Sequence, residues 1–150
     1  MPTRRTPRKT RPGNRLRVQR AAAGAPPSAV LRRFARAALP ARAEVTLRIV
    51  NAPESRRLNG KFRMKRKPTN VLSFPYGGGS GDVVLCHPVI AKEAKAQRKT
   101  LRAHYAHLVV HGVLHLRGHD HRRRLDAARM ERIEIRLLRS LGFDNPYTVK

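Results

Sequence analysis

The sequence predicts an α+β fold in which helices pack on a small mixed β-sheet. Short segments rich in β-branched residues alternate apolar and polar side chains, as strands do. Longer segments repeat apolar residues at helical spacing, as amphipathic helices do. These segments follow one another in the order helix, strand, helix, strand, strand and then three helices. A chain of 150 residues in this order is long enough for one domain with a buried core.

The predicted strands are short and lie in the middle of the chain. Residues 44–51 alternate and contain several β-branched side chains. Residues 70–76 and 82–86 form the next two strands, joined by the flexible, glycine-rich residues 77–81. Because proline has no amide hydrogen to donate, Pro75 places the end of its strand at a sheet edge or at a bulge.

The predicted helices have recognisable ends. Thr100 is expected to cap one helix, since its hydroxyl can accept a hydrogen bond from a backbone N–H of the first turn. Pro40 and Gly142 mark two helix ends. The last helix carries one apolar stripe, formed by Met130, Ile133, Leu137, Leu138 and Leu141. The predicted helices cover residues 28–39, 52–62, 88–98, 101–117 and 125–141.

The charge of the chain indicates a polyanionic partner. It has 34 Lys and Arg residues against 9 Asp and Glu residues, a formal net charge of +25, which far exceeds what solubility requires. Nucleic acid is the first candidate. A membrane surface is less favoured because aromatic residues make up only 5% of the chain and tryptophan is absent. No apolar run approaches the ~20 residues that a membrane-spanning helix needs.

The single cysteine indicates a reducing compartment, and we expect the protein in the cytoplasm. Cys86 has no second cysteine with which to form an internal disulfide. It lies in an apolar strand segment, where a buried thiol is favoured over a nucleophile.

Residues 1–25 are predicted to be a basic, disordered tail, and residues 26–150 a single catalytic, metal-binding domain. No acidic residue occurs before Glu44, and residues 1–20 show no apolar periodicity. Such a segment suits a nucleic-acid-binding arm. The same composition is compatible with an organelle transit peptide or with an extension that has no function.

Residues 111–121 contain three histidines at H-x3-H-x5-H spacing, which predicts a metal site. His111 and His115 are four residues apart, so on a helix they lie on the same face, one turn from each other. Gly118 can take the left-handed conformation that ends a helix, and the chain reversal then brings His121 back as a third ligand. Three neutral imidazoles suit Zn²⁺ and leave a fourth coordination position open for catalysis.

The residue after the first histidine argues against a metalloprotease. Zinc proteases with this histidine spacing place a glutamate there as general base, whereas this chain has Gly112. A zinc ion on three histidines can still lower the pKa of a bound water to about 7. Zinc is the favoured metal, although nickel, copper and iron also bind imidazole.

Several blocks of this sequence resemble the YbeY family of bacterial endoribonucleases and rRNA maturation factors. The motif HGVLHLRGHDH at residues 111–121 is close to the signature of that family. The segment PTNVLSFP at residues 68–75 matches a second block. The resemblance extends from about residue 44 to residue 147. Further matches are at Leu58-Asn59, Phe62-Arg63, Gly81-Asp82, His104, His107, Met130-Glu131 and Glu134.

The resemblance implies a zincin-like, metal-dependent hydrolase fold with one catalytic Zn²⁺ per chain on His111, His115 and His121. It implies cleavage of single-stranded RNA, with the 16S rRNA and the small ribosomal subunit as partners. The implied cellular roles are maturation of the 16S rRNA 3′ end and ribosome quality control. Arg63 falls where the family has a functionally important arginine beside the metal.

The candidates for catalysis and RNA binding beside the metal are Arg63, Lys65, Lys67 and Asp120. The guanidinium of Arg63 suits the negative charge that develops on a phosphate, and Lys65 and Lys67 could position neighbouring phosphates. For these three residues, a solvated basic surface is the alternative. Asp120 could act as general base, could orient a ligand histidine, or could be a turn residue.

Weaker predictions concern other polar and aromatic residues. Glu131 and Glu134 are expected to form salt bridges with arginines, of small value if exposed. His107 is expected to line the cleft or to be a packing residue. The candidates for stacking on RNA bases, each also compatible with the core, are Phe74, Tyr76 and Tyr105.

A second functional hypothesis is an assembly factor that binds rRNA or the ribosome. In that case the zinc mainly holds the fold, and nuclease activity is weak or incidental. Loss of His115 would then lower the melting temperature sharply and leave RNA binding unchanged.

Overall fold

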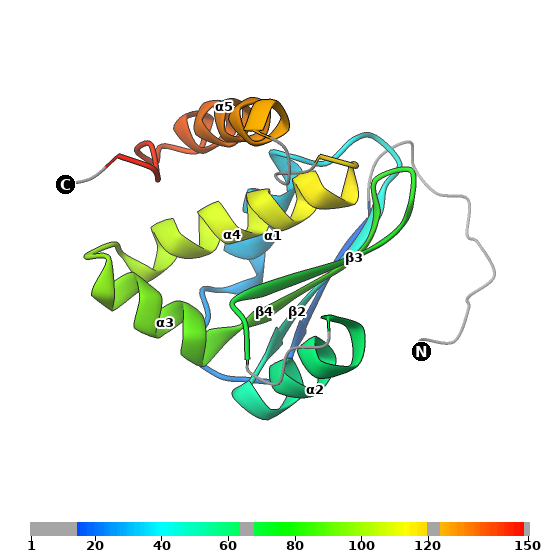
Figure 1. The fold of residues 1–150 in the computed structure, drawn as a ribbon, viewed down its shortest axis with the longest axis vertical. Coiled ribbons are helices and arrows are strands. Elements are labelled where there is room, and N and C mark those ends of the chain that lie inside the picture. Colours follow the sequence, from blue (N-terminus) through cyan, green and yellow to red (C-terminus); the bar gives the residue numbers. More distant parts are fainter. Residues whose placement is uncertain (1–14, 64–67, 120–123, 149–150) are drawn as a thin grey trace.

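A computed structural model describes residues 15–63, 68–119 and 124–148 of the chain (Figure 1). In chain order the elements are β1 (Arg15–Arg20), α1 (Ser28–Arg36), β2 (Glu44–Val50), α2 (Ala52–Arg63), β3 (Val71–Gly77), β4 (Ser80–Cys86), α3 (His87–Ala96), α4 (Leu101–Leu116) and α5 (Arg124–Ser140). Strands and helices alternate up to β3, β4 follows β3 directly, and the described chain after β4 is helical.

The strands form one mixed sheet with the order β1-β2-β4-β3. β1 and β4 both run parallel to β2, and β3 runs antiparallel to β4. Parallel neighbours need a crossover between them, and α1 provides it between β1 and β2. Helix α2 lies on one face of the sheet, α1 and α4 lie on the other, and α5 lies beyond α4 (Figure 1). The predicted α+β fold with a mixed sheet is confirmed.

Strand β1 corrects the prediction of a disordered tail over residues 1–25. Arg15–Arg20 pairs with β2, and its Leu16 and Val18 pack against the main core. The segment reads R-L-R-V-Q-R, so the alternation of a strand is present, but only two apolar residues carry it among many positive charges. The prediction was therefore wrong for this strand. Residues 1–14 lie outside the described part of the chain.

The other predicted elements are found within a few residues of their expected bounds. The largest difference is at α1, which ends at Arg36 instead of continuing to Leu39. Pro40 accounts for this, because the residue before a proline is driven out of the helical conformation.

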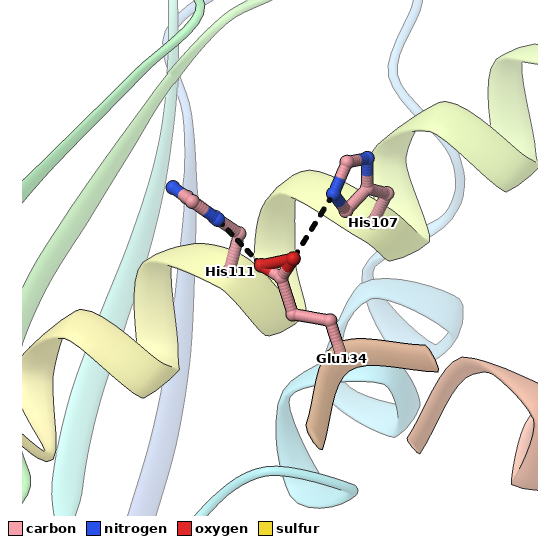
Figure 2. A group of neighbouring side chains, drawn as sticks. All are labelled: His107, His111 and Glu134. Atoms are coloured by element: carbon pink, nitrogen blue, oxygen red, sulfur yellow. Dashed lines mark hydrogen bonds and ion pairs between the residues drawn. The ribbon is translucent and has the colours of Figure 1, made fainter. Parts of the chain in front are cut away.

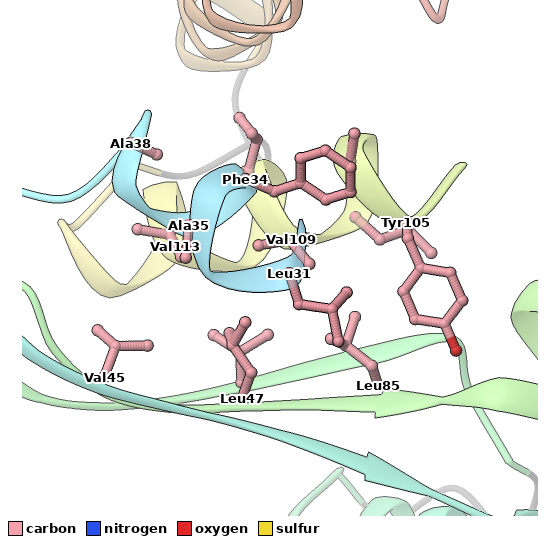
Figure 3. Packing of buried hydrophobic residues seen from close by; sticks show 14 of the residues in the cluster. Leu31, Phe34, Ala35, Ala38, Val45, Leu47, Leu85, Tyr105, Val109 and Val113 are labelled. Atoms are coloured by element: carbon pink, nitrogen blue, oxygen red, sulfur yellow. The ribbon is translucent and has the colours of Figure 1, made fainter. Parts of the chain in front are cut away.

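The main core lies between the sheet and helices α1 and α4 (Figure 3). It contains Leu31 and Phe34 from α1, Leu47 and Leu85 from the sheet, and Tyr105 from α4, all less than 2% exposed. Burying each such side chain contributes about 1.5–3 kcal/mol. Tyr105 is therefore a core residue, and its position excludes the alternative of stacking on RNA.

A smaller core lies on the α2 side of the sheet and includes Leu72, Val84 and Cys86. Cys86 is 1% exposed, so the predicted buried thiol is confirmed. β3 is an edge strand, and its pairing shifts register between Pro75 and Gly77, as the proline predicted. Among the described helices, none has the length and apolar composition that crossing a bilayer requires.

Candidate metal centre

Helix α4 presents a row of histidines along one face. Its first turn is capped by Thr100, whose Oγ1 accepts a hydrogen bond from the backbone N–H of Ala103 at 3.0 Å. The helix ends at Leu116, and Gly118 follows with φ +92°, in the left-handed region that favours glycine, as predicted. Successive members of the row are three or four residues apart: His104, His107, His111 and His115.

His111 and His115 lie at the spacing that one metal ion requires. Their Nε2 atoms are 3.1 Å apart, and their ring centroids are 4.6 Å apart. Two imidazole nitrogens at about 2.0–2.1 Å from a tetrahedral Zn²⁺ lie about 3.3–3.4 Å from each other. The predicted pairing of these two histidines across one helical turn is thus present in the fold, and the geometry of the pair fits a zinc ion.

Glu134 of α5 contacts His111 at Nδ1, the ring nitrogen that does not face His115. Its side chain is 0% exposed, and one of its oxygens accepts a hydrogen bond from His111 Nδ1 at 2.6 Å (Figure 2). The other oxygen accepts a hydrogen bond from the hydroxyl of Tyr147 and lies 3.5 Å from His107 Nε2. Because the proton of His111 is on Nδ1, its Nε2 lone pair is directed away from Glu134 and towards His115.

The carboxylate of Glu134 is ionised despite its burial. Burial alone would raise the pKa of Glu134, but the hydrogen bonds from His107, His111 and Tyr147 outweigh it and hold the pKa at about 2. The charged carboxylate therefore accepts the hydrogen bond of His111 inside the protein.

The expectation that Glu134 forms a salt bridge with an arginine is wrong. The sequence did contain a signal, since Glu134 lies one helical turn after Met130 and one turn before Leu138, and both are buried. An acidic residue on the buried stripe of a basic helix requires a partner inside the protein. Tyr147 was also missed, because no periodic pattern covers the chain after α5.

His107, His111 and Glu134 could together hold one metal ion. Each offers one ligand atom, and these atoms lie within 4.8 Å of one another. The three side chains come from α4 and α5 and point towards a common centre (Figure 2). This group and the pair His111–His115 use opposite nitrogens of His111, so the fold offers two possible positions for an ion.

The other predicted site residues are placed only in part. Arg63 is the last residue of α2, and nothing beyond its backbone is described. Lys65, Lys67, Asp120 and His121 lie outside the described residues. Their roles beside the metal stay predictions.

Gly112 is required by the close approach of α4 to the sheet. A Cβ atom at this position would lie 2.7 Å from Val83 Cγ1 and 3.2 Å from Ser73 Oγ. Ser73 Oγ in turn donates a hydrogen bond to the Gly112 carbonyl at 2.9 Å, so this serine joins β3 to α4. The glutamate of zinc proteases has no space after the first histidine here, which strengthens the argument against a metalloprotease.

His104 and His87 serve the structure. His104 is 3% exposed, and its Nε2 lies 2.9 Å from Glu93 Oε1 on α3. Burial lowers the pKa of His104, and Glu93 offsets only part of this effect. His87 Nδ1 lies 2.7 Å from the hydroxyl of the core residue Tyr105. Both histidines therefore stabilise packing between elements.

The fold and these side chains define an α+β protein whose helix α4 carries a group that could hold one metal ion. A model of the family described as endoribonuclease YbeY matches residues 18–142. The chain belongs to that family. The resemblance carried by the histidine motif is thereby confirmed, and so is the expectation of an endoribonuclease.

Curated relatives and a solved structure agree with this assignment. An endoribonuclease YbeY of Aromatoleum aromaticum is 51% identical over 140 residues, which cover 88% of this chain and 91% of the relative. One of Methylococcus capsulatus is 49% identical over 141 residues, with 88% and 94% covered. The solution structure of TM1509 from Thermotoga maritima is similar in fold, with a TM-score of 0.56 and 20% identity, over 89% of this chain and 99% of that chain.

Proposed function

We propose that this protein is a zinc-dependent endoribonuclease specific for single-stranded RNA. It acts in the cytoplasm on the 3′ end of 16S rRNA, in complex with the small ribosomal subunit, and takes part in ribosome quality control. The ligands of its single Zn²⁺ are His111, His115 and His121. The observation that supports this most directly is the row Glu134–His111–His115, in which a buried carboxylate orients one imidazole towards the other.

The Nε2 side of His111 is the better position for the ion. On the Nδ1 side, both oxygens of Glu134 already accept hydrogen bonds, from His111 and from Tyr147. An ion there would have to replace both of these bonds inside a fully buried group. On the Nε2 side, Glu134 keeps its bonds and supports the ligand histidine instead.

The remaining residues have distinct tasks in this proposal. When bound, zinc supplies Lewis acidity and a water of lowered pKa. Arg63 holds the negative charge on the phosphate that is cleaved, and Lys65 and Lys67 position neighbouring phosphates. Asp120 either accepts a proton during cleavage or orients a ligand histidine.

The test is cleavage of a labelled single-stranded fragment from the 3′ end of 16S rRNA, with the metal content measured on the same samples. We expect His115→Ala to lose the metal and the cleavage together. His87→Gln is the matched control, because His87 lies on α3 and contacts Tyr105. This variant should keep both the metal and the cleavage activity. Cleavage by a metal-free His115→Ala protein would contradict the proposal.

The assembly-factor hypothesis gives a different result in the same experiment. The contact between His111 and Glu134 joins α4 to α5, so an ion on α4 could serve mainly to hold these helices together. Under this hypothesis, His115→Ala lowers the melting temperature strongly, while RNA binding by the folded fraction and a low rate of cleavage persist.

A further inference from the structure

The face of the sheet opposite α4 has an open groove that the metal centre does not use. Helix α2 covers part of this face (Figure 1). Beside it lies a groove of about 610 Å³ that extends across all strands of the sheet. Its walls include Arg15 and Arg17 of β1, Arg48 of β2, Tyr76 of β3 and Asp82 of β4. We call it the outer groove.

The outer groove follows from strand alternation. In β1, the apolar side chains Leu16 and Val18 pack in the main core, so the arginines on either side of Leu16 face the opposite side of the sheet. In β2, Thr46 and Arg48 face the groove in the same way, while Leu47 between them is buried. The arginines of β1 thus form one wall of the groove by register.

The arginines of the outer groove differ in how strongly they are paired with acidic side chains. Arg48 donates to both oxygens of Glu54, at 2.6 and 2.9 Å, and is occupied by this ion pair. Arg15 makes a single 3.3 Å contact with Glu44, whose side chain is 65% exposed, a weak surface pair. Arg17 is exposed and makes no ion pair with another described residue. The β1 wall therefore offers guanidinium groups to an anion.

Tyr76 provides a flat apolar surface across the groove from these arginines. It is 62% exposed, although large aromatic side chains are usually buried. Its hydroxyl donates a hydrogen bond to Asp82, which fixes the direction of the ring and occupies the carboxylate. A fixed, exposed ring is a surface on which a nucleobase can stack.

We propose that the outer groove binds single-stranded RNA, with phosphates on Arg15 and Arg17 and a base stacked on Tyr76. The β1 and β3 walls are three strand spacings apart, about 14 Å, which a short run of nucleotides bridges. Weakly paired guanidinium groups together with one exposed ring suit a polyanion with flat bases. The inference rests on the proposed function, since it adds a second contact for the same RNA substrate away from the metal.

The test compares RNA of two lengths on the zinc-loaded enzyme. A strand of about 12 nucleotides is long enough to occupy more than one site, whereas one of about 4 nucleotides fills a single site. We expect Tyr76→Ala and Arg17→Ala each to raise KM for the long strand at least about fivefold and to leave its kcat unchanged. Neither variant should change KM or kcat for the short strand. Tyr76→Phe keeps the ring and should stay within about threefold of the parent protein.

The matched control is Arg139→Ala, which removes an exposed arginine from α5. An equal rise in KM with Arg139→Ala would overturn the groove as a specific contact. Equal rises in KM for both strand lengths in the groove variants would overturn it as well. Binding of a cleavage-resistant phosphorothioate RNA of about 12 nucleotides is measured in parallel. If no protein cleaves RNA, the proposed function fails, and this binding measurement still decides the groove. Unchanged binding in both groove variants would refute it.

Discussion

At the scale of single residues, the candidate metal centre depends on one buried carboxylate, that of Glu134. Glu134 lies fully buried on α5 and contacts His111, Tyr147 and His107. It fixes which nitrogen of His111 carries the proton, and thereby which nitrogen faces His115. Tyr147 fixes the carboxylate in turn, so the segment after α5 is connected to the site through one hydroxyl.

Replacing this carboxylate should weaken metal binding more than it weakens the fold. We expect Glu134→Gln to lower zinc affinity by about 10–100-fold, the range usual for partners of ligand histidines. Competition with a chelating dye measures this. Glu131→Gln on the same helix is the control, since Glu131 is no part of the metal centre and should keep the parent affinity. An unchanged zinc affinity in Glu134→Gln would show that the carboxylate does not support the site.

At the scale of elements, the position of α4 against the sheet decides which chemistry is available. The helix lies so close to β3 and β4 that a Cβ atom at residue 112 would overlap Val83. The same closeness allows Ser73 of β3 to donate a hydrogen bond to the helix backbone. The histidine row is therefore anchored to the sheet, and Val83 occupies the space that a side chain at residue 112 would need.

A methyl group at position 112 tests this contact directly. We expect Gly112→Ala to destabilise the protein by about 1–3 kcal/mol, because its Cβ would overlap Val83 and one of the two must move. Urea unfolding measures the free energy. Adding Val83→Ala removes the opposing methyl groups, so the double variant should be more stable than the sum of the two single changes predicts. Simple additivity would mean that α4 is not packed as tightly as described.

At the scale of the whole molecule, the basic N-terminal region is divided between two roles. Arg15–Arg20 completes the sheet, contributing Leu16 and Val18 to the core on one face and arginines to the outer groove on the other. The strong positive charge of the chain is thus built partly into its fold.

RNA affinity should accordingly fall as the salt concentration rises, by about 0.7 log units per log unit of salt for each phosphate contact.

Two truncations distinguish the contribution of β1 to stability from that of the residues before it. Removing residues 1–20 deletes β1, so we expect a clear fall in the melting temperature, because β2 loses one of its two neighbouring strands and the core loses two apolar side chains. Removing residues 1–14 leaves β1 in place and should keep the melting temperature. Thermal unfolding followed by circular dichroism distinguishes the two. Equal melting temperatures for both truncations would show that β1 contributes little to stability.

Local patterns were enough to predict most elements and the pairing of the first two histidines of the motif across one helical turn. The period of apolar residues is set by the geometry of a single helix or strand, and the four-residue spacing of His111 and His115 already implies one helical face. The elements found along most of the chain agree with these predictions, because each apolar stripe is long enough to identify its helix or strand without knowledge of tertiary contacts.

Contacts between distant segments could not be read in this way. The place of β1 beside β2 depends on pairing across α1, and too few apolar residues marked it in advance. The partnership of His111 with Glu134 joins two helices, and only their packing brings the carboxylate to Nδ1. The sequence by itself determined the local elements and the placement of His111 and His115 on one helical face. The tertiary structure alone decided what supports that pair and which face of the sheet is open, because both depend on side chains that are far apart along the chain.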